Sequence, residues 1–573
     1  MTEETAPGEH WPVLIAGGGP SGLALAIELG RAGVRCRVVE PRPSVTGDRP
    51  RAKTTSARTM ELFRRWGIAD RVRAAAPLPV SYAQDVVFCT SLTGRELTRF
   101  RNAFALHAER RAEFAECGQQ IPQPAVEEIL REVVAGLPSV EFSTGHRLVS
   151  AEDGPDLVRA RVVAPDGTET VVTADYLAGC DGAGGVTREA IGATYAGGSG
   201  ELPNLNVTFR APALTGDRLC ARAVHYWVLG ARTGGIAGPM DLDGTWWAIA
   251  QGVDVRTGDV DPAALVRDMI GADVPIEVLA TDPWVARMLL VDRYRGRRTF
   301  LVGDAAHLNP PWGGHGFNTC VGDAVNLGWK LVAVLRGWAG PGLLDSYEPE
   351  RRPVARQTIA DASAQESRLA RAFARADLDA DGPAGDARRA EVARALEAKR
   401  GEFHSLGLVL GYHYADSPVV VDDGSPVPEH APLTYHGSAR PGARLPHRWL
   451  ADGSSLYDHL GPGFTLLRLG ADGAAAVGGL DGGDSVDDGG GADGVGGADV
   501  DAFRAAAAAC GVPLTVLDIP DLPDADAYGA PLLLVRPDQH IAWRGAPGEA
   551  AAGAAAILDT ALGGARSPAG LAT

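Results

Sequence analysis

A glycine-rich turn near the start of the chain carries the first chemical signal. Residues 17–22 read GGGPSG and fit the pattern GxGxxG. Glycines at these places allow a tight turn and a close backbone approach to a pyrophosphate, which the N–H groups of a following helix bind. An acid twenty residues further on accepts hydrogen bonds from a ribose diol, and it favours FAD or NAD over NADP. The predicted dinucleotide-binding residues are Gly17, Gly19, Pro20, Ser21, Gly22 and Glu40.

Two Gly-Asp segments far downstream offer further carboxylates. Asp181 follows Gly179-Cys180, and Asp304 follows Gly303 in the run TFLVGDAAH. A carboxylate at the end of a strand can bind a polyol hydroxyl, and the adjacent glycine permits a close approach. Either segment taken alone is equally compatible with a simple turn whose aspartate caps a helix.

The loop after Asp304 favours a functional interpretation. Residues 309–318 read NPPWGGHGFN, with three glycines and two prolines ahead of a helix expected from about Thr319. A rigid loop with few bulky side chains can lie flat against a planar ring, and the helix dipole stabilises negative charge on that ring. A reduced isoalloxazine carries such charge near N1 and O2. The three segments together therefore predict a flavin site.

The elements that must position these residues follow an α/β pattern. A strand over 13–16, a helix over 23–32 and a strand over 36–39 surround the glycine turn. Strand-like runs with glycine turns between 205 and 253 indicate a separate sheet inserted into the nucleotide-binding domain. Further helices are expected over Ser56–Trp66, 124–134 and 321–336, and strands over His225–Leu229, Trp246–Gln251 and Phe300–Val302.

The chain changes character near Gly437. Residues 445–469 and 513–535 predict strands and helices of a small α/β unit. The stretch Gly470–Asp499 between them is rich in glycine and aspartate and predicts a flexible surface loop. The alanine run before Cys510 predicts a buried helix.

Composition excludes several classes of function. The 573 residues carry a net charge of -18, which argues against a general nucleic-acid binder. The sequence contains no run of 18 apolar residues, so we expect no membrane span. The acidic N-terminus is unlike a signal peptide. The seven scattered cysteines form no CxxC and no metal-like cluster, so we expect reduced thiols, no metal and a cytoplasmic location.

Longer segments carry a family resemblance. The stretches GDAAHLNPPWGGHGFNTCVGDAVNLGWKL, LLDSYEPERRPVA and SARTMELFRRWG resemble the class A FAD-dependent aromatic monooxygenases, typified by p-hydroxybenzoate and phenol hydroxylases. The later RPGARLPHRWL and LLLVRPDQHIAWRG resemble the longer members, such as 2,4-dichlorophenol hydroxylases and actinomycete oxygenases that tailor polyketides or indolocarbazoles. The resemblance spans about residues 11–546.

The resemblance implies a domain division. A p-hydroxybenzoate-hydroxylase-like FAD domain of Rossmann type would occupy 1–195 and 285–350, and a substrate-binding sheet domain would occupy 196–284. A helical segment and linker would cover 351–436. A thioredoxin-like domain without CxxC would cover 437–573, with no role in disulfide exchange.

The resemblance also implies roles for single residues. Arg51 would contact the pyrophosphate, Gln123 the ribityl–phosphate region and Asp304 a ribityl hydroxyl. Pro311 would face the isoalloxazine near its reactive carbon, and Asp181 would lie near the glycine turn. Gly303 of the Gly-Asp turn would also belong to the cofactor site. The residues expected to border the ring system are Gly314, Gly316, Phe317 and Asn318.

Two positions depart from the family pattern. Gly184-Gly185 stands where an Arg-Ser pair is common, which affects the details of the segment after Asp181. His315 replaces a residue that is often Gln, Phe or Leu. A side chain facing the substrate is one interpretation, but we expect an exposed loop histidine.

The implied activity is hydroxylation of a phenolic or polycyclic aromatic substrate with NADPH or NADH and O2, through a flavin hydroperoxide. Alternatives are Baeyer–Villiger oxidation, epoxidation or decarboxylation in natural-product biosynthesis, or a non-catalytic FAD-binding protein. Tyr226 and His225 are candidates for deprotonating the phenol. Trp227, Trp246, Trp247 and Met240 are candidate pocket walls, and a homodimer is left open.

Overall fold

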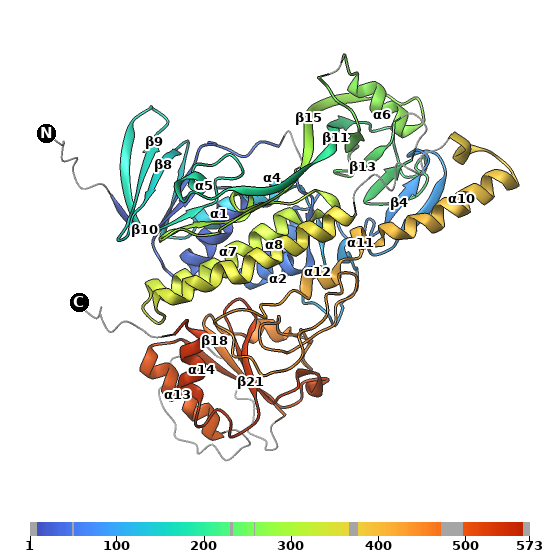
Figure 1. Ribbon diagram of the computed structural model, residues 1–573. Helices are drawn as coiled ribbons and strands as arrows, with labels where there is room; N and C mark the ends of the chain where they lie inside the picture. The colour runs from blue at the N-terminus through green and yellow to red at the C-terminus, as the bar shows by residue number, and fades with distance from the viewer. Residues whose placement is uncertain are drawn as a thin grey trace. The chain divides into compact units, whose positions relative to one another are not determined.

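The computed structural model describes residues 9–47, 51–229, 233–256, 258–365, 376–470 and 497–564 (Figure 1). The chain divides into two compact units. The first unit comprises Met1–Gly328, Arg351–Val409 and Ala431–Thr434, and the second comprises Trp329–Glu350, Leu410–His430 and Tyr435–Thr573.

A seven-stranded sheet organises the first unit. Its order is β7-β2-β1-β10-β9-β8, and β16 also pairs with β10. The strands β1, β2, β7, β10 and β16 are parallel, whereas β8 and β9 are antiparallel additions. β2 is buried along its whole length, as expected of a parallel strand covered on both faces. The strand bounds are β1 His10–Ala16, β2 Cys36–Glu40, β7 Val140–Thr144, β8 Arg147–Asp153, β9 Val158–Val163, β10 Glu169–Gly179 and β16 Thr299–Leu301.

The helices around this sheet confirm most of the predicted elements. α1 (Pro20–Arg31) follows the glycine turn, and α4 (Gln123–Ala135) packs against it. α2 (Ala57–Arg65) is capped by Ser56, whose Oγ accepts a hydrogen bond from the Thr59 N–H at 3.3 Å. α7 (Gly316–Leu335) begins several residues before the predicted start. Among the described residues before 435, the other helices of eight or more residues are α6 Pro262–Ile270, α8 Tyr347–Ala364 and α10 Pro383–Ala395.

A second sheet of eight strands carries the predicted insertion. Its order is β17-β15-β11-β14-β13-β12-β4-β5, and the long strands β11 and β15 pair over most of their length. The sheet also includes β4 and β5, which come from a much earlier part of the chain than residues 196–284. The bounds are β4 Val86–Cys89, β5 Glu96–Phe100, β11 Tyr195–Arg210, β12 His225–Val228, β13 Gly235–Pro239, β14 Thr245–Gln251, β15 Glu277–Val291 and β17 His307–Leu308.

The second unit contains a thioredoxin-like arrangement. β18 (Phe464–Leu469) and β19 (Leu514–Ile519) are parallel and are connected through α13 (Gly497–Cys510). β20 (Leu532–Val535) and β21 (Ile541–Gly545) then form an antiparallel hairpin, giving the order β19-β18-β20-β21 before α14 (Ala554–Ala561).

The prediction of a buried helix in this unit is wrong. The alanine run is not a buried helix, because α13 is amphipathic, with Ala507 buried and Ala505, Ala508 and Ala509 exposed. Cys510 is only partly buried. The predicted loop Gly470–Asp499 falls mostly on residues 471–496, which lie outside the described residues, but its last three residues open α13.

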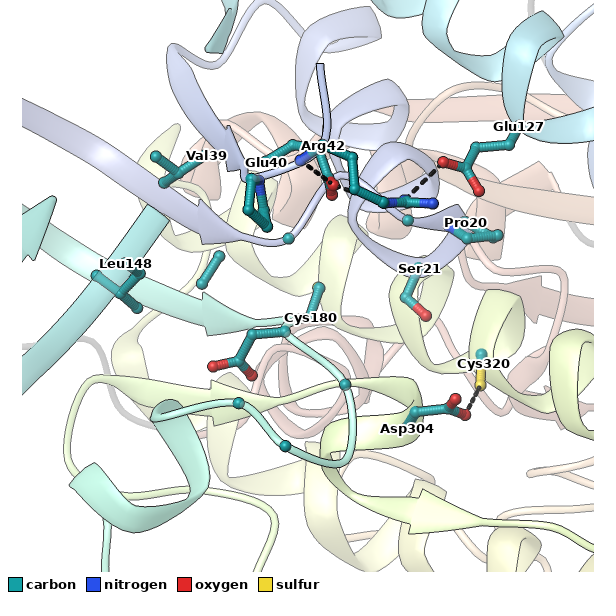
Figure 2. Close-up of a pocket in the computed structure, with 18 of the residues that line it drawn as sticks. Pro20, Ser21, Val39, Glu40, Arg42, Glu127, Leu148, Cys180, Asp304 and Cys320 are labelled. Atoms are coloured by element: carbon teal, nitrogen blue, oxygen red, sulfur yellow. Dashed lines mark hydrogen bonds and ion pairs between the residues drawn. The ribbon is translucent and has the colours of Figure 1, made fainter. Parts of the chain in front are cut away.

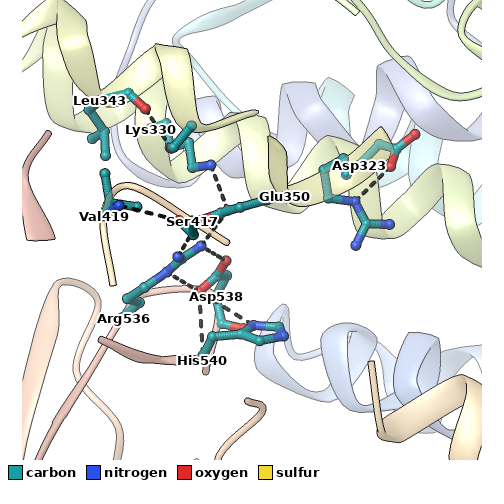
Figure 3. A network of polar contacts seen from close by, with 11 residues as sticks. Asp323, Lys330, Leu343, Glu350, Ser417, Val419, Arg536, Asp538 and His540 are labelled. Atoms are coloured by element: carbon teal, nitrogen blue, oxygen red, sulfur yellow. Dashed lines mark hydrogen bonds and ion pairs between the residues drawn. The ribbon is translucent and has the colours of Figure 1, made fainter. Parts of the chain in front are cut away.

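A buried cluster of charges supports the second unit (Figure 3). Glu350 accepts a hydrogen bond from Lys330 Nζ at 2.7 Å and two from Arg536 at 2.6 and 2.9 Å. Ser417 Oγ donates to the same carboxylate at 2.6 Å, and Arg536 Nη2 also donates to Asp538 Oδ2 at 2.6 Å. Each buried charge thus has an opposite charge beside it, which is the condition for burying it at all.

Within the described ranges, no helix is both long and apolar enough to cross a membrane.

Candidate active site

A cavity of about 570 Å³ lies at the carboxyl ends of the parallel strands β1, β2 and β10 (Figure 2). The structure brings ten of the predicted residues together on its wall. These are Gly17, Gly19, Pro20, Ser21, Glu40, Arg51, Gln123, Asp181, Asp304 and Phe317. We call this space the dinucleotide cavity. Residues from distant parts of the chain meet there because β1, β10 and β16 are neighbours in one sheet.

The glycine turn has the geometry of a phosphate cradle. Gly17 has a φ of +98°, and a Cβ there would lie 2.3 Å from the Cys180 carbonyl oxygen. A Cβ on Gly22 would lie 1.9 Å from the Gly17 carbonyl oxygen, whereas Gly19 has no atom within 4 Å of that position. No capping side chain accepts a hydrogen bond from the N-terminus of α1. The N–H groups of its first turn are therefore available to a phosphate.

Glu40 is held rigidly at the edge of this cradle. Its Oε2 accepts a hydrogen bond from the Gly18 N–H at 2.7 Å, and its Oε1 accepts one from Arg42 Nε at 2.7 Å. Arg42 also donates to Glu127 Oε1 at 2.7 Å (Figure 2). Sequence reasoning missed Arg42 and Glu127, although a basic residue two places after the acid was a usable signal.

Asp181 lines the cavity but is already engaged within the protein. Its two carboxylate oxygens accept hydrogen bonds from the Thr187 N–H at 3.0 Å and the Thr187 Oγ at 2.6 Å. These bonds cap α5 (Thr187–Ala190), as in the alternative interpretation of this turn. A Cβ on Gly185 would lie 2.0 Å from Asp181 Cγ, so the departure from the family pattern at Gly185 permits this close approach.

Asp304 is the carboxylate that faces the cavity. Its side chain is exposed to the cavity, and its Oδ1 accepts a weak hydrogen bond from Cys320 Sγ at 3.5 Å. Desolvation by the surrounding protein raises the pKa of the carboxyl group. The preceding Gly303 does not line the cavity, because it packs where a Cβ would lie 2.4 Å from Ser21 Oγ. Gly303 therefore joins the Gly-Asp turn to the glycine turn, and Asp304 alone projects towards a ligand.

A buried network beneath this turn was not predicted from the sequence. Asp323 on α7 lies 2.8 Å from His307 Nε2 and accepts a hydrogen bond from Arg351 Nε at 2.7 Å. Asp323 also accepts a hydrogen bond from the Gly303 N–H at 3.3 Å, and His307 Nδ1 lies 2.7 Å from Asn309 Oδ1. The network thus fixes the start and end of the loop that follows Asp304.

The flavin loop predicted over 309–318 is fixed by its last residue. Asn318 Oδ1 accepts hydrogen bonds from the Ser56 N–H and Thr59 Oγ, while its Nδ2 donates to the carbonyl oxygens of Thr54 and Gly314. All polar positions of the Asn318 amide are used, so this residue holds the loop.

The prediction that His315 is exposed is wrong. The residue is only 6% exposed, because its ring packs beneath Gly313, where a Cβ would lie 2.4 Å from His315 Nε2. Burial lowers the pKa of His315 to about 4.

A second cavity of about 340 Å³ adjoins the first and lies against the eight-stranded sheet. Arg51, Ala52 and Phe317 line both cavities. We call this second space the ring cavity. Its wall includes the loop residues Pro311, Gly314 and Gly316, the indole rings of Trp227, Trp247 and Trp284, and the polar side chains of Asn204, Asn206, Thr208 and Gln251.

The structure separates the two candidates for deprotonating a phenol. His225 lines the ring cavity, whereas the neighbouring Tyr226 projects to the opposite face of β12, because successive side chains alternate along a strand. Tyr226 is fully buried, and its hydroxyl donates to the Ala221 carbonyl oxygen at 2.7 Å. Trp246 lies on that same face against Tyr226. Tyr226 therefore has a structural place in the core.

Lys53 is a cavity residue that sequence reasoning missed. Its Nζ lies 3.4 Å from His225 Nε2 and 3.1 Å from the centroid of the Trp247 ring. Burial lowers the pKa of Lys53 well below its ordinary value, and it lowers the pKa of His225 likewise, with a further contribution from Lys53. The signal available in the sequence was the rarity of lysine, since the chain has only three.

The fold and the paired cavities define a flavin-dependent oxygenase. Residues 10–362 match the model of the FAD binding domain family, and residues 438–565 match the model of the aromatic-ring hydroxylase C-terminal family. The chain belongs to the FAD-dependent aromatic-ring monooxygenases. It is an oxidoreductase that uses FAD and NAD(P)H and hydroxylates aromatic substrates.

Characterised relatives match nearly the whole chain. The 2,4-dichlorophenol 6-monooxygenase of Cupriavidus pinatubonensis is 30% identical, over 96% of this chain and 96% of that protein. The aklavinone 12-hydroxylase RdmE of Streptomyces purpurascens is 32% identical, over 96% and 98%.

Solved structures match the fold over the same extent. The rebeccamycin biosynthetic enzyme RebC with reduced flavin superposes with a TM-score of 0.82 at 35% identity, over 97% of this chain and 99% of that chain. The flavin-dependent monooxygenase PieE in complex with FAD and substrate gives a TM-score of 0.84 at 31% identity, over 97% and 100%.

Proposed function

We propose that the dinucleotide cavity holds the ADP and ribityl parts of FAD, and that the ring cavity holds the isoalloxazine edge with a phenolic or small polycyclic aromatic substrate. The observation that carries this proposal is the junction of the two cavities at Arg51, Ala52 and Phe317. A dinucleotide bound along the glycine turn and Asp304 would pass this junction and reach the loop that contains Pro311.

The residues present fit FAD. The uncapped N-terminus of α1 and the open Gly19 suit a pyrophosphate, and Arg51 adds a cation beside it. Asp304 offers a carboxylate to the ribityl hydroxyls, and Gln123 lies on the same wall. When bound and reduced by NAD(P)H, FAD supplies the activation of O2, one atom of which enters the substrate while the other leaves as water.

The wall of the ring cavity suits a planar aromatic with polar substituents. Four tryptophans, including Trp312 of the loop, provide apolar faces, and asparagine, threonine and glutamine side chains from β11 and β14 provide hydrogen-bond partners. The named relatives that act on dichlorophenol and aklavinone support this class of substrate for the chain. We propose the same functional division as the resemblance implies, with FAD at 1–195 and 285–350 and substrate at 196–284.

The test is substrate-stimulated oxygenation. Protein purified with excess FAD should release about one FAD per chain on acid precipitation, and phenols that bind should accelerate oxidation of NADPH or NADH. With labelled dioxygen, the product should gain one labelled oxygen as a hydroxyl group. Stoichiometric hydrogen peroxide without an oxygenated product would overturn the assignment, and a lactone, an epoxide or loss of carbon dioxide would replace hydroxylation with another oxygenation.

We also propose a cytoplasmic location, and a homodimer stays one open alternative for the assembly. All seven cysteines are free thiols, which suits a reducing compartment. Light scattering of the FAD-loaded protein tests the dimer, and a monomeric mass across the working concentration range would exclude it.

A further inference from the structure

We propose that Lys53 is the base that accepts the phenolic proton of the substrate, and that His225 positions its amine. This inference rests on the proposed function of the ring cavity. It assigns a step that neither the family match nor the motifs assign to a residue of this chain.

The use of lysine in this chain is the first observation. Only three of its 54 Lys and Arg residues are lysines, at positions 53, 330 and 399. Lys330 pairs with Glu350 at 2.7 Å, and Lys399 Nζ lies 2.6 Å from Glu402 Oε2. Among the described residues, no carboxylate forms an ion pair with Lys53, so its surroundings differ from those of the other two.

The contacts of the Lys53 amine are the second observation. His225 Nε2 lies 3.4 Å from the Lys53 amine. As a neutral imidazole nitrogen it can accept a hydrogen bond from Lys53 whether Lys53 is an amine or an ammonium. The Trp247 ring, 3.1 Å from the amine, stabilises an ammonium once it forms. The half-buried site thus disfavours a resting charge on the amine, yet it offers two partners for a charge that arises during binding.

The charged and titratable groups around the cavity decide where the proton can go. The described residues of this kind on its wall are Arg51, Lys53, His225 and Glu402. Arg51 has no proton to gain, and Glu402 is already paired with Lys399. His225 carries two ring contacts, to Phe104 and Trp247, that hold its ring in place. Lys53 is therefore the acceptor with both access and basicity.

The proton transfer balances without any co-reactant. The phenol O–H bond breaks, its electron pair stays on oxygen, and a new N–H bond forms on Lys53 Nζ. The products are a phenolate and an ammonium, so the net charge of the cavity is unchanged. The phenolate is a stronger nucleophile than the phenol, and the ammonium beside it keeps it in place.

Lysine NMR measures the resting state of Lys53 without turnover. Protein labelled with 13C at the lysine ε position and loaded with FAD should give three signals, with that of Lys53 assigned by its absence in Lys53→Met. We expect the Lys53 signal to titrate well below the ordinary lysine value of about 10.4. Titration in that ordinary range would overturn the proposal and would leave the monooxygenase function standing.

His225 is tested by the same signal. In His225→Leu the ammonium form of Lys53 loses its acceptor, so its titration should move to still lower pH. His225→Gln keeps an acceptor and should move the titration less. An unchanged Lys53 titration in His225→Leu would remove the positioning role of His225.

A phenolic probe distinguishes a base from a fixed cation. We would use 4-nitrophenol with the FAD-loaded enzyme, at a pH where the free probe is mainly neutral, and record its phenolate absorbance. Calorimetry in two buffers of different ionisation enthalpy would count the protons released. The wild type should show bound phenolate with close to zero protons released, because the proton moves to Lys53.

Matched variants complete this test. Lys53→Arg should bind phenolate but release about one proton per probe, whereas Lys53→Met should bind the neutral phenol. Tyr226→Phe removes the neighbouring hydroxyl on β12, which points away from the ring cavity, and it should behave as the wild type. Neutral phenol in the wild type, or one proton released from it, would overturn the proposal. If the probe does not bind, the NMR titration decides alone.

Discussion

His307 Nε2 lies 2.8 Å from Asp323 Oδ2, and both side chains are fully buried. The pair joins the end of the Gly-Asp turn to α7, the helix that begins at the flavin loop. Burial lowers and Asp323 raises the pKa of His307, with a net rise, while Arg351 and His307 hold the pKa of Asp323 below its ordinary value despite burial. The pair is therefore an ion pair that supports the site from beneath.

The pair predicts a pH window of stability. The contribution of Asp323 is present above about pH 3.8 and is lost as the pH falls through its lower folded value. The contribution of His307 is complete below about pH 6.5 and is lost as the pH rises through its higher folded value. Asp323→Asn should destabilise the first unit by about 3–5 kcal/mol within that window. Urea denaturation at several pH values checks this, and an effect independent of pH would contradict it.

The buried His315 should make the protein more stable as the pH rises, which is opposite to the effect expected of His307. Its folded pKa of about 4 lies below the unfolded value of 6.5, so the unfolded chain binds more protons between these values. Stability should therefore fall by up to about 3 kcal/mol as the pH drops from 6.5 to 4. His315→Gln should flatten this part of the curve, whereas His436→Gln, at an exposed position, should not. Parallel curves for both variants would contradict the assignment.

The two Gly-Asp turns predict unequal losses of FAD. Asp304→Ala removes a carboxylate that faces the cavity and should weaken FAD binding by about 1–3 kcal/mol. Asp181→Ala removes the cap of α5 and should mainly lower stability, by about 1 kcal/mol. Flavin fluorescence titrations and urea denaturation of both variants separate these effects. Equal FAD affinities in two folded variants would contradict the ranking.

The two lysines near the ring cavity predict opposite changes in stability. Lys53→Met removes the amine of a half-buried side chain and keeps its volume, so the free energy of unfolding should stay the same or rise by about 1–2 kcal/mol. Lys399→Met leaves Glu402 buried without its cation and should cost about 3–5 kcal/mol. Urea denaturation of the two variants side by side is the measurement. A large loss in Lys53→Met would show that this lysine is needed for folding.

Local patterns were sufficient to predict the cofactor segments. The glycine turn, Glu40 and the loop after Asp304 are continuous in sequence, and their strands and helices follow from short-range periodicity. The α/β class and the thioredoxin-like unit follow from the same signals together with the family resemblance.

Contacts made between distant segments could not be predicted in this way. Lys53 and His225 are 172 residues apart, and nothing in the loop around Lys53 indicates that it reaches β12. The incorporation of β4 and β5 into the second sheet depends on pairing across more than 130 residues, since Val86 pairs with His225. His315 was misjudged because its burial depends on a neighbour without a Cβ, Gly313.

The wall of the dinucleotide cavity joins stretches that lie far apart in the sequence, and Gly17–Glu40, Asp181 and Asp304 are three of them. A ligand that contacts all three stabilises the folded state, in addition to its role in the reaction. At a free concentration of one hundred times its dissociation constant, such a ligand adds about 2.7 kcal/mol to the free energy of unfolding. Proteolytic resistance and flavin content should therefore decline together, so cofactor supply would set the lifetime of this protein.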